Sequence, residues 1–181
     1  MYKIFRSAFL VAFLGASLSA MTIKFSTAAV GTTGGGETIF RFSYDLSGVS
    51  LLLNQELDVR FDPAVYSSLL NPVAPAALFD LLVLQPNNPP GAFGDYSLLA
   101  LVNNPSTAGP FSVDATLVAG QALPSSQPFF INQLDSNGGF VSLIDNGLAT
   151  NPVPEPGTLL MAGAGFIGVL LLRAAQKRPR Q

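Results

Sequence analysis

No cysteine, histidine or tryptophan occurs among the 181 residues of the chain. Without cysteine and histidine, the protein cannot form a Ser-His-Asp or Cys-His nucleophile pair, a thiolate metal site, the usual haem ligation or a disulfide framework. Charged residues are also scarce: they make up 11% of the chain, about half of the usual quarter. These absences predict a protein that is not an enzyme and that binds no cofactor.

The few charges are unevenly distributed along the chain. Basic residues gather near the two ends, and only Arg41 and Arg60 lie between residues 30 and 152. The same interval holds ten of the eleven acidic residues, so its net charge is −8. A surface that acidic repels phosphate backbones and anionic lipid headgroups. We therefore expect no nucleic-acid partner.

Residues 1–20 have the three parts of a secretory signal peptide. Two basic residues precede an apolar run over residues 8–14, and small residues follow it. Ser17 and Ser19 would allow cleavage after Ser19, and residues 26–28 offer a second site whose cut would fall after residue 28. The alternative is an uncleaved N-terminal anchor, for which the apolar run is far shorter than the ~20 residues that span a bilayer.

A single transmembrane helix is predicted near the C-terminus. Residues 158–172 carry no charge, and a helix of that length extends about 22 Å, which is minimal for a hydrocarbon core of ~30 Å. A basic tail follows over residues 173–181. Because basic flanks stay in the cytoplasm, this order predicts a cytoplasmic tail, a body outside and contact with membrane lipid through the helix. The basic residues of the tail are Arg173, Lys177, Arg178 and Arg180.

A proline-rich linker over residues 151–157 joins the body to this helix. Its alternating prolines fix φ and remove backbone donors, so we expect an extended tether. Glu155 resists transfer into hydrocarbon, which should hold the linker at the outer interface of the membrane. The centre of the linker is the motif Val153, Pro154, Glu155 and Pro156.

The order of motif, apolar helix and basic tail over residues 153–181 resembles the PEP-CTERM sorting signal of Gram-negative bacteria. The resemblance implies that an exosortase, a membrane-embedded cysteine peptidase, recognises the motif and processes the protein near it. It also implies export across the inner membrane, with the body first anchored outside and then delivered to the cell surface or the extracellular space. Such proteins typically come from bacteria that make exopolysaccharide, which is therefore a candidate partner.

Between the two signals, residues 30–150 have the pattern of an all-β body. Gly and Pro interrupt the chain at short intervals, leaving little room for long helices. Polar and apolar residues alternate in residues 40–46, 56–61 and 111–117, and the uniformly apolar runs are residues 49–53, 78–84, 98–102, 129–134 and 140–144. We expect an antiparallel β-sandwich of about seven or eight strands, with a hairpin turn at residues 135–139. Residues 62–70 resemble a two-turn helix with Asp62 as its N-cap.

The best metal candidate in this body is a weak calcium site. Asp135 and Asn137 lie in the predicted hairpin turn, and Asp145 follows on the next strand. Millimolar-range affinity would suffice for an exported protein. The spacing lacks a bidentate acid, however, and Asp, Asn and Gly are also the residues of an ordinary turn. We therefore expect no metal here.

Two further functions stay open for the body. Glu56 and Asp58 lie on one face of a predicted strand, as a carboxylate-dependent glycoside hydrolase would need, although the polar face of an exposed sheet also accounts for them. A carbohydrate-binding module would need exposed rings. The rings near loops are Tyr66, Phe93 and Tyr96, whereas Phe40, Phe42, Phe61, Phe111 and Phe129 are expected in the core. The leading hypothesis is a non-catalytic structural or adhesive protein associated with exopolysaccharide.

Overall fold

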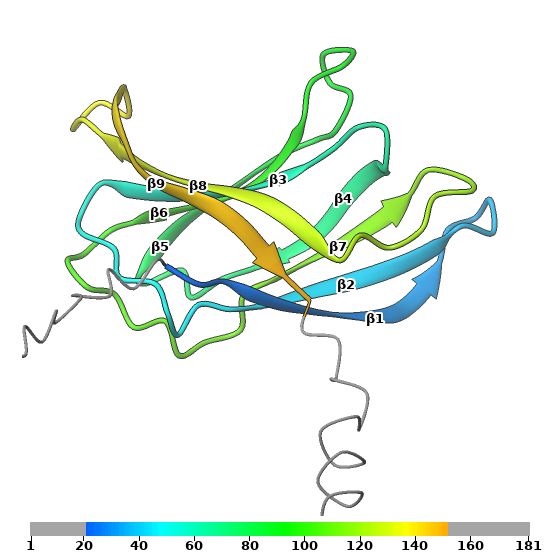
Figure 1. Cartoon of the computed structure of the whole chain (residues 1–181), viewed down its shortest axis with the longest axis horizontal. Helices are drawn as coiled ribbons and strands as arrows, with labels where there is room; N and C mark the ends of the chain where they lie inside the picture. Colours follow the sequence, from blue (N-terminus) through cyan, green and yellow to red (C-terminus); the bar gives the residue numbers. More distant parts are fainter. Residues whose placement is uncertain (1–20, 152–181) are drawn as a thin grey trace, which may run out of the picture.

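The computed structural model describes residues 21–151, which form nine β-strands and no helix (Figure 1). The strands are β1 (Lys24–Thr32), β2 (Thr38–Asp45), β3 (Gln55–Phe61), β4 (Tyr66–Val73), β5 (Phe79–Leu84), β6 (Gly94–Ala100), β7 (Ser112–Leu117), β8 (Ser126–Leu134) and β9 (Phe140–Thr150). The prediction of an all-β body is confirmed. The expected signal peptide at residues 1–20 and the linker, helix and tail after residue 151 lie outside the described residues.

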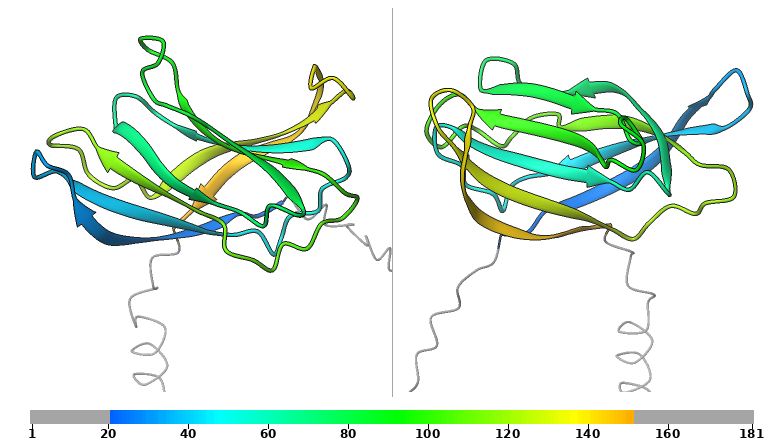
Figure 2. Two further views of the ribbon diagram at one scale, coloured as in Figure 1. Left: turned by 180° about the vertical axis from the view of Figure 1, so that it is seen from behind. Right: turned by 90° about the horizontal axis from the view of Figure 1, so that it is seen from above.

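All nine strands belong to one sheet, in the order β4-β7-β2-β1-β9-β8-β3-β6-β5. Every neighbouring pair is antiparallel except β1 and β9, which run parallel and are joined only at Lys24 and Thr150. The sheet curves so strongly that the half β4-β7-β2-β1 faces the half β9-β8-β3-β6-β5 (Figure 2). Among residues 21–151, no helix has the length and apolar character needed to cross a membrane.

The expected sandwich of seven or eight strands is therefore corrected to one continuous, nearly closed sheet of nine. The two halves are continuous because the first and last described strands meet at the pair Lys24 and Thr150. On the other side, the side chain of Gln85 substitutes for a strand partner of β4. Its Oε1 accepts a hydrogen bond from Leu69 N at 2.9 Å, and its Nε2 donates to Leu69 O at 2.8 Å. This amide satisfies part of an edge that would otherwise be open.

Aromatic side chains from both halves fill the space between them. The Phe42 ring on β2 meets Phe61 on β3 edge to face at 5.8 Å, and Phe61 meets Tyr66 on β4 at 4.8 Å. Such pairs contribute about 0.5–1.5 kcal/mol beyond the apolar area that they bury. The predicted core positions Phe42, Phe61, Phe111 and Phe129 are confirmed, whereas Phe40 is only half-buried.

Two local predictions have opposite outcomes. The hairpin turn at residues 135–139 is confirmed: Asp135 N donates to Gly139 O at 2.8 Å, and Gly138 has a φ of 81°. The helix expected at residues 62–70 is wrong. Asp62 does cap the local backbone by accepting from Ala64 N at 2.8 Å, but the chain then enters β4. Burial of Tyr66 and Leu69 in the core and the pairing of β4 with β7 outweigh the local helical signal.

The folded body also begins earlier than residue 30. β1 starts at Lys24, and the side chains of Ile23 and Phe25 are fully buried. β1 was not apparent in the sequence because most of its side chains are small or polar, as its sequence KFSTAAVGT shows. The strand is defined by its long antiparallel pairing with β2, from Lys24 and Asp45 to Thr32 and Thr38.

Candidate functional site

The carboxylates of Glu56 and Asp58 lie on the outer face of β3, as the alternation of the sequence predicts. Each is held by a neighbouring strand. Ser97 Oγ on β6 donates to Glu56 Oε1 at 2.5 Å, and Asn132 Nδ2 on β8 donates to Asp58 Oδ2 at 2.7 Å. The fold thus brings together the acidic pair and adds two polar partners, from strands far apart in the sequence, that sequence reasoning missed.

On this outer face of β3 and β6, acidic side chains outnumber basic ones. Burial, followed by the nearby negative charge of Glu56, raises the pKa of Asp58 to about 6. Burial also raises the pKa of Asp95 on β6, although Arg60 Nε lies 3.6 Å from its Oδ1. The Arg60 guanidinium in turn lies over the Phe130 ring at 4.5 Å. A raised carboxyl pKa is a property of general acids, but Glu56 and Asp58 line none of the three hollows described below.

Another acidic residue on an outer face of the sheet, Asp114, is only 2% exposed and is fully paired. Its Oδ1 accepts from Arg41 Nε at 2.7 Å, and its Oδ2 accepts from Arg41 Nη2 and Asn71 Nδ2, both at 3.0 Å. The hydrogen bond with Arg41 holds the pKa of Asp114 below its usual value. This bidentate pair joins β2 to β7, and its donors leave no open side for a ligand.

Of the three calcium candidates, Asp145 lies apart from Asp135 and Asn137 in the fold. Asp135 Oδ1 accepts hydrogen bonds from Asn137 N and Gly139 N, both at 2.8 Å, and these bonds lower the pKa of Asp135. Asp145 pairs with Ile131 on β8, which places it four residues, or about 13 Å, along the hairpin from the turn. Within residues 21–151, no group of three His, Cys, Asp or Glu residues is arranged to hold a metal ion. Asp135 therefore stabilises the hairpin turn through its hydrogen bonds to the turn backbone.

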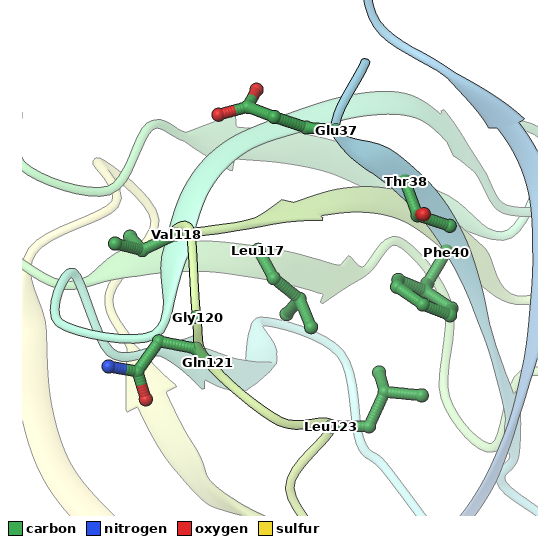
Figure 3. Close-up of a pocket in the computed structure, with 8 residues that line it drawn as sticks. All are labelled: Glu37, Thr38, Phe40, Leu117, Val118, Gly120, Gln121 and Leu123. Atoms are coloured by element: carbon green, nitrogen blue, oxygen red, sulfur yellow. The ribbon is translucent and has the colours of Figure 1, made fainter.

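A hollow of about 340 Å³ opens between the start of β2 and the loop after β7 (Figure 3). Phe40, Leu117 and Leu123 form its apolar centre, and the side chains of Glu37 and Gln121 lie at its margin. The half-exposed position of Phe40 is explained by this opening. Glu37 is the single ionisable group among the lining residues, so the hollow offers little chemistry beyond apolar contact.

A second hollow, of about 320 Å³, lies where β3 ends and β8 begins. Arg60, Tyr66, Phe93 and Gln127 are among its lining residues. Phe93 is 43% exposed, whereas Tyr66 is 2% exposed and Tyr96 is fully buried. Of the three rings that sequence placed near loops, only Phe93 is therefore available to a ligand. A third, smaller hollow of about 170 Å³ lies beside Lys24 and Asp45.

Gln127 was not singled out from the sequence, but it is central to the core. Tyr44 Oη donates to its Oε1 at 2.8 Å, and its Nε2 donates to Tyr66 Oη at 3.0 Å. Burial raises the pKa of both tyrosines. The amide thus connects the two facing halves of the sheet through a buried polar chain. Its signal in the sequence is faint: one polar residue at an inward position of a strand.

The most exposed apolar residues of the described chain gather on β9. Phe140 is 67% exposed and Val141 59% exposed, and Leu143 and Ile144 are also exposed. β9 pairs with β8 along one edge, whereas its other edge is paired only at Thr150. We call residues 140–144, with the turn before them, the hairpin tip. It projects from the curved sheet in Figure 1.

β9 leads directly into the proline-rich linker. Thr150 N donates to Ile23 O at 3.1 Å, and Asn151 N donates to Ser125 O at 2.9 Å. A model of the PEP-CTERM protein-sorting motif matches residues 152–178, which begin at the next residue. The chain carries a PEP-CTERM sorting motif. This motif indicates an exported, membrane-associated sorting substrate of Gram-negative bacteria and implies processing by an exosortase, which is a membrane protein.

The PEP-CTERM match includes all four residues of the predicted motif and ends within the basic tail at Arg178. No curated protein and no solved structure matches the chain. Only Asn151 lies between the end of β9 and the first residue of the matched segment.

Proposed function

We propose that this PEP-CTERM protein is a non-catalytic surface or extracellular-matrix component whose body does structural or adhesive work in association with exopolysaccharide. In this proposal, residues 1–20 direct export and are removed. The helix at residues 158–172 anchors the precursor with its body outside and its basic tail in the cytoplasm. Exosortase acts at the motif around Glu155 and Pro156. The sorting motif supports the proposed location, and the structure of the body supports the proposed structural or adhesive role.

The hairpin tip is the observation that carries the adhesive role. Exposed apolar patches on soluble domains mark interaction sites, and here four large side chains are exposed within five residues. β9 has eleven residues, so the tip lies about 36 Å from the base of the linker. A tip at that distance from the anchor would be free to meet material outside the cell.

The test compares binding of the processed protein to exopolysaccharide isolated from the producing strain, measured by co-sedimentation. Phe140→Ser combined with Val141→Ser should reduce binding about tenfold, which corresponds to a loss of about 1.4 kcal/mol. The matched control is Leu82→Ser combined with Leu84→Ser, because these side chains are also exposed but lie on β5. Equal binding by both double variants, or no binding by the wild type, would contradict the adhesive role.

A carbohydrate-binding module is the second candidate, favoured by the hollow that combines the exposed Phe93 ring with Arg60. In that case Phe93→Ala would abolish sugar binding while the hairpin-tip variant would not.

The third candidate is a carboxylate-dependent glycoside hydrolase. The raised pKa of Asp58 beside Glu56 favours it, and release of reducing ends from exopolysaccharide, lost in Asp58→Asn, would identify it.

A further inference from the structure

The first described residues belong to the core of the body. Ile23 is fully buried and Phe25 is 2% exposed, and Met21 packs against the same core. The Phe25 ring lies 5.6 Å from that of Phe42 and 6.1 Å from that of Tyr44. These side chains cannot be removed without exposing the aromatic cluster between the two halves of the sheet.

The backbone of the same segment is also held in place, by strand pairing and by close packing. Lys24 pairs with Asp45, and the pairing with β2 continues through Ala28 and Arg41. A Cβ added to Gly48 would lie 2.7 Å from Thr22 O, so the loop after β2 packs closely against the chain before β1. The segment is therefore held both by its side chains and by its backbone.

This segment also connects the two ends of the body. Ile23 O accepts the hydrogen bond from Thr150 N, and Lys24 is the residue that pairs with Thr150. Figure 2 shows β1 beginning and β9 ending on the same side of the molecule. A chain that began at Ala29 would lack the pair between the two halves of the sheet and the acceptor for Thr150 N, two residues before the sorting motif.

We propose that the signal peptide is removed at the earlier of the two candidate sites, after Ser19, so that the mature chain starts at Ala20 and keeps the whole of β1. The enzyme would be a membrane-associated endopeptidase that recognises small residues at the first and third positions before the cut, here Ser19 and Ser17. Residues 26–28 have a similar pattern but form part of β1. This inference rests on the secretory signal in the proposed function.

The experiment is intact-mass measurement of the full chain after export, in membrane and extracellular fractions. Wild-type protein should begin at Ala20. Ser19→Arg should leave the precursor uncut or reduce the processed fraction by at least tenfold. Ala28→Arg is the matched control, because it also replaces a small residue at a candidate cut and because Ala28 is exposed on β1. It should be processed like the wild type.

The possible failures are distinguishable. Wild-type protein that begins at Ala29, or an Ala28→Arg variant that stays uncut, would overturn the placement of the cut while leaving export intact. Wild-type protein that retains residues 1–19 would overturn the cleaved signal peptide itself, and the inference with it. Because the masses report on the chain ends whether or not a variant folds, a destabilised variant still gives a result.

Discussion

At the scale of single residues, the surroundings of a carboxylate decide its role in the body. Asp58 and Asp114 both lie on outer faces of the curved sheet, yet their pKa values move in opposite directions. Asp114 meets the guanidinium of Arg41, whereas Asp58 is half-buried beside a second acid, Glu56. The sequence predicted one polar strand face for Glu56 and Asp58, but it could not predict the partners of these acids, which come from strands brought together only by folding.

The raised pKa of Asp58 predicts an unusual pH dependence of stability. A folded-state pKa of about 6 against a usual value of 3.8 means that the charged form destabilises the folded state near neutral pH. Lowering the pH from 7 to 5 protonates Asp58 and should increase the free energy of unfolding in urea. Below about pH 4, loss of the ionised form of Asp114, whose pKa is lowered, should reverse the gain.

Asp58→Asn should therefore be more stable than the wild type at pH 7 and should lose most of the increase between pH 7 and 5. Asp80→Asn on β5, an exposed position, is the control and should retain the wild-type dependence. An Asp58→Asn protein with unchanged stability at pH 7 would show that burial beside Glu56 does not destabilise the charged form.

At the scale of elements, strands with regular alternation were predictable and those defined by pairing were not. β3 alternates apolar and polar residues and was expected, as was the turn between β8 and β9, because Asp135 and Gly138 suit turn geometry. β1 was missed and β4 was mistaken for a helix. β1 is defined by its hairpin ladder with β2, which its small and polar side chains do not reveal, and β4 depends on its partner β7, which is distant in sequence. Local propensity carries little information about such contacts.

The edge of β4 provides a test of one distant contact. Gln85→Ala removes the side chain that hydrogen-bonds to both the amide and the carbonyl of Leu69 on that side and should lower the free energy of unfolding by about 1–2 kcal/mol. Hydrogen exchange at Leu69 N should accelerate in parallel. Gln121→Ala, in the exposed loop after β7, should change neither quantity. If Gln85→Ala left the exchange of Leu69 unchanged, the side chain would not be the partner of that edge.

At the scale of the whole molecule, sorting depends on a segment that begins one residue after the described body. This segment could be identified from the sequence without knowledge of the fold, because the motif, the apolar run and the basic tail are contiguous in the sequence. The work of the body was harder to predict. Its most exposed apolar residues lie in a strand whose sequence resembled that of a buried one, and only the position of β9 at an open edge distinguishes the two cases.

Replacing Glu155 by Gln together with Pro156 by Ala should leave the protein in the inner membrane with its C-terminal tail retained, because the exosortase would no longer recognise the motif. Cell fractionation and the intact mass of the C-terminus measure both effects. Glu37→Gln, in the exposed turn between β1 and β2, should be sorted normally. Unchanged fractionation and mass in the motif variant would place processing elsewhere.

The orientation of β9 also determines how the body would carry a mechanical load. If the tip adheres to matrix and the C-terminal end is held at the membrane, as we propose, tension would act lengthwise along this strand. Because both points of attachment lie on β9, its covalent backbone would carry the tension, and the hydrogen bonds of its ladder with β8, from Thr150 and Ser126 to Phe140 and Leu134, would not have to open under the load. We expect a tethered body of this kind to withstand drag from flowing liquid better than one pulled across its strands.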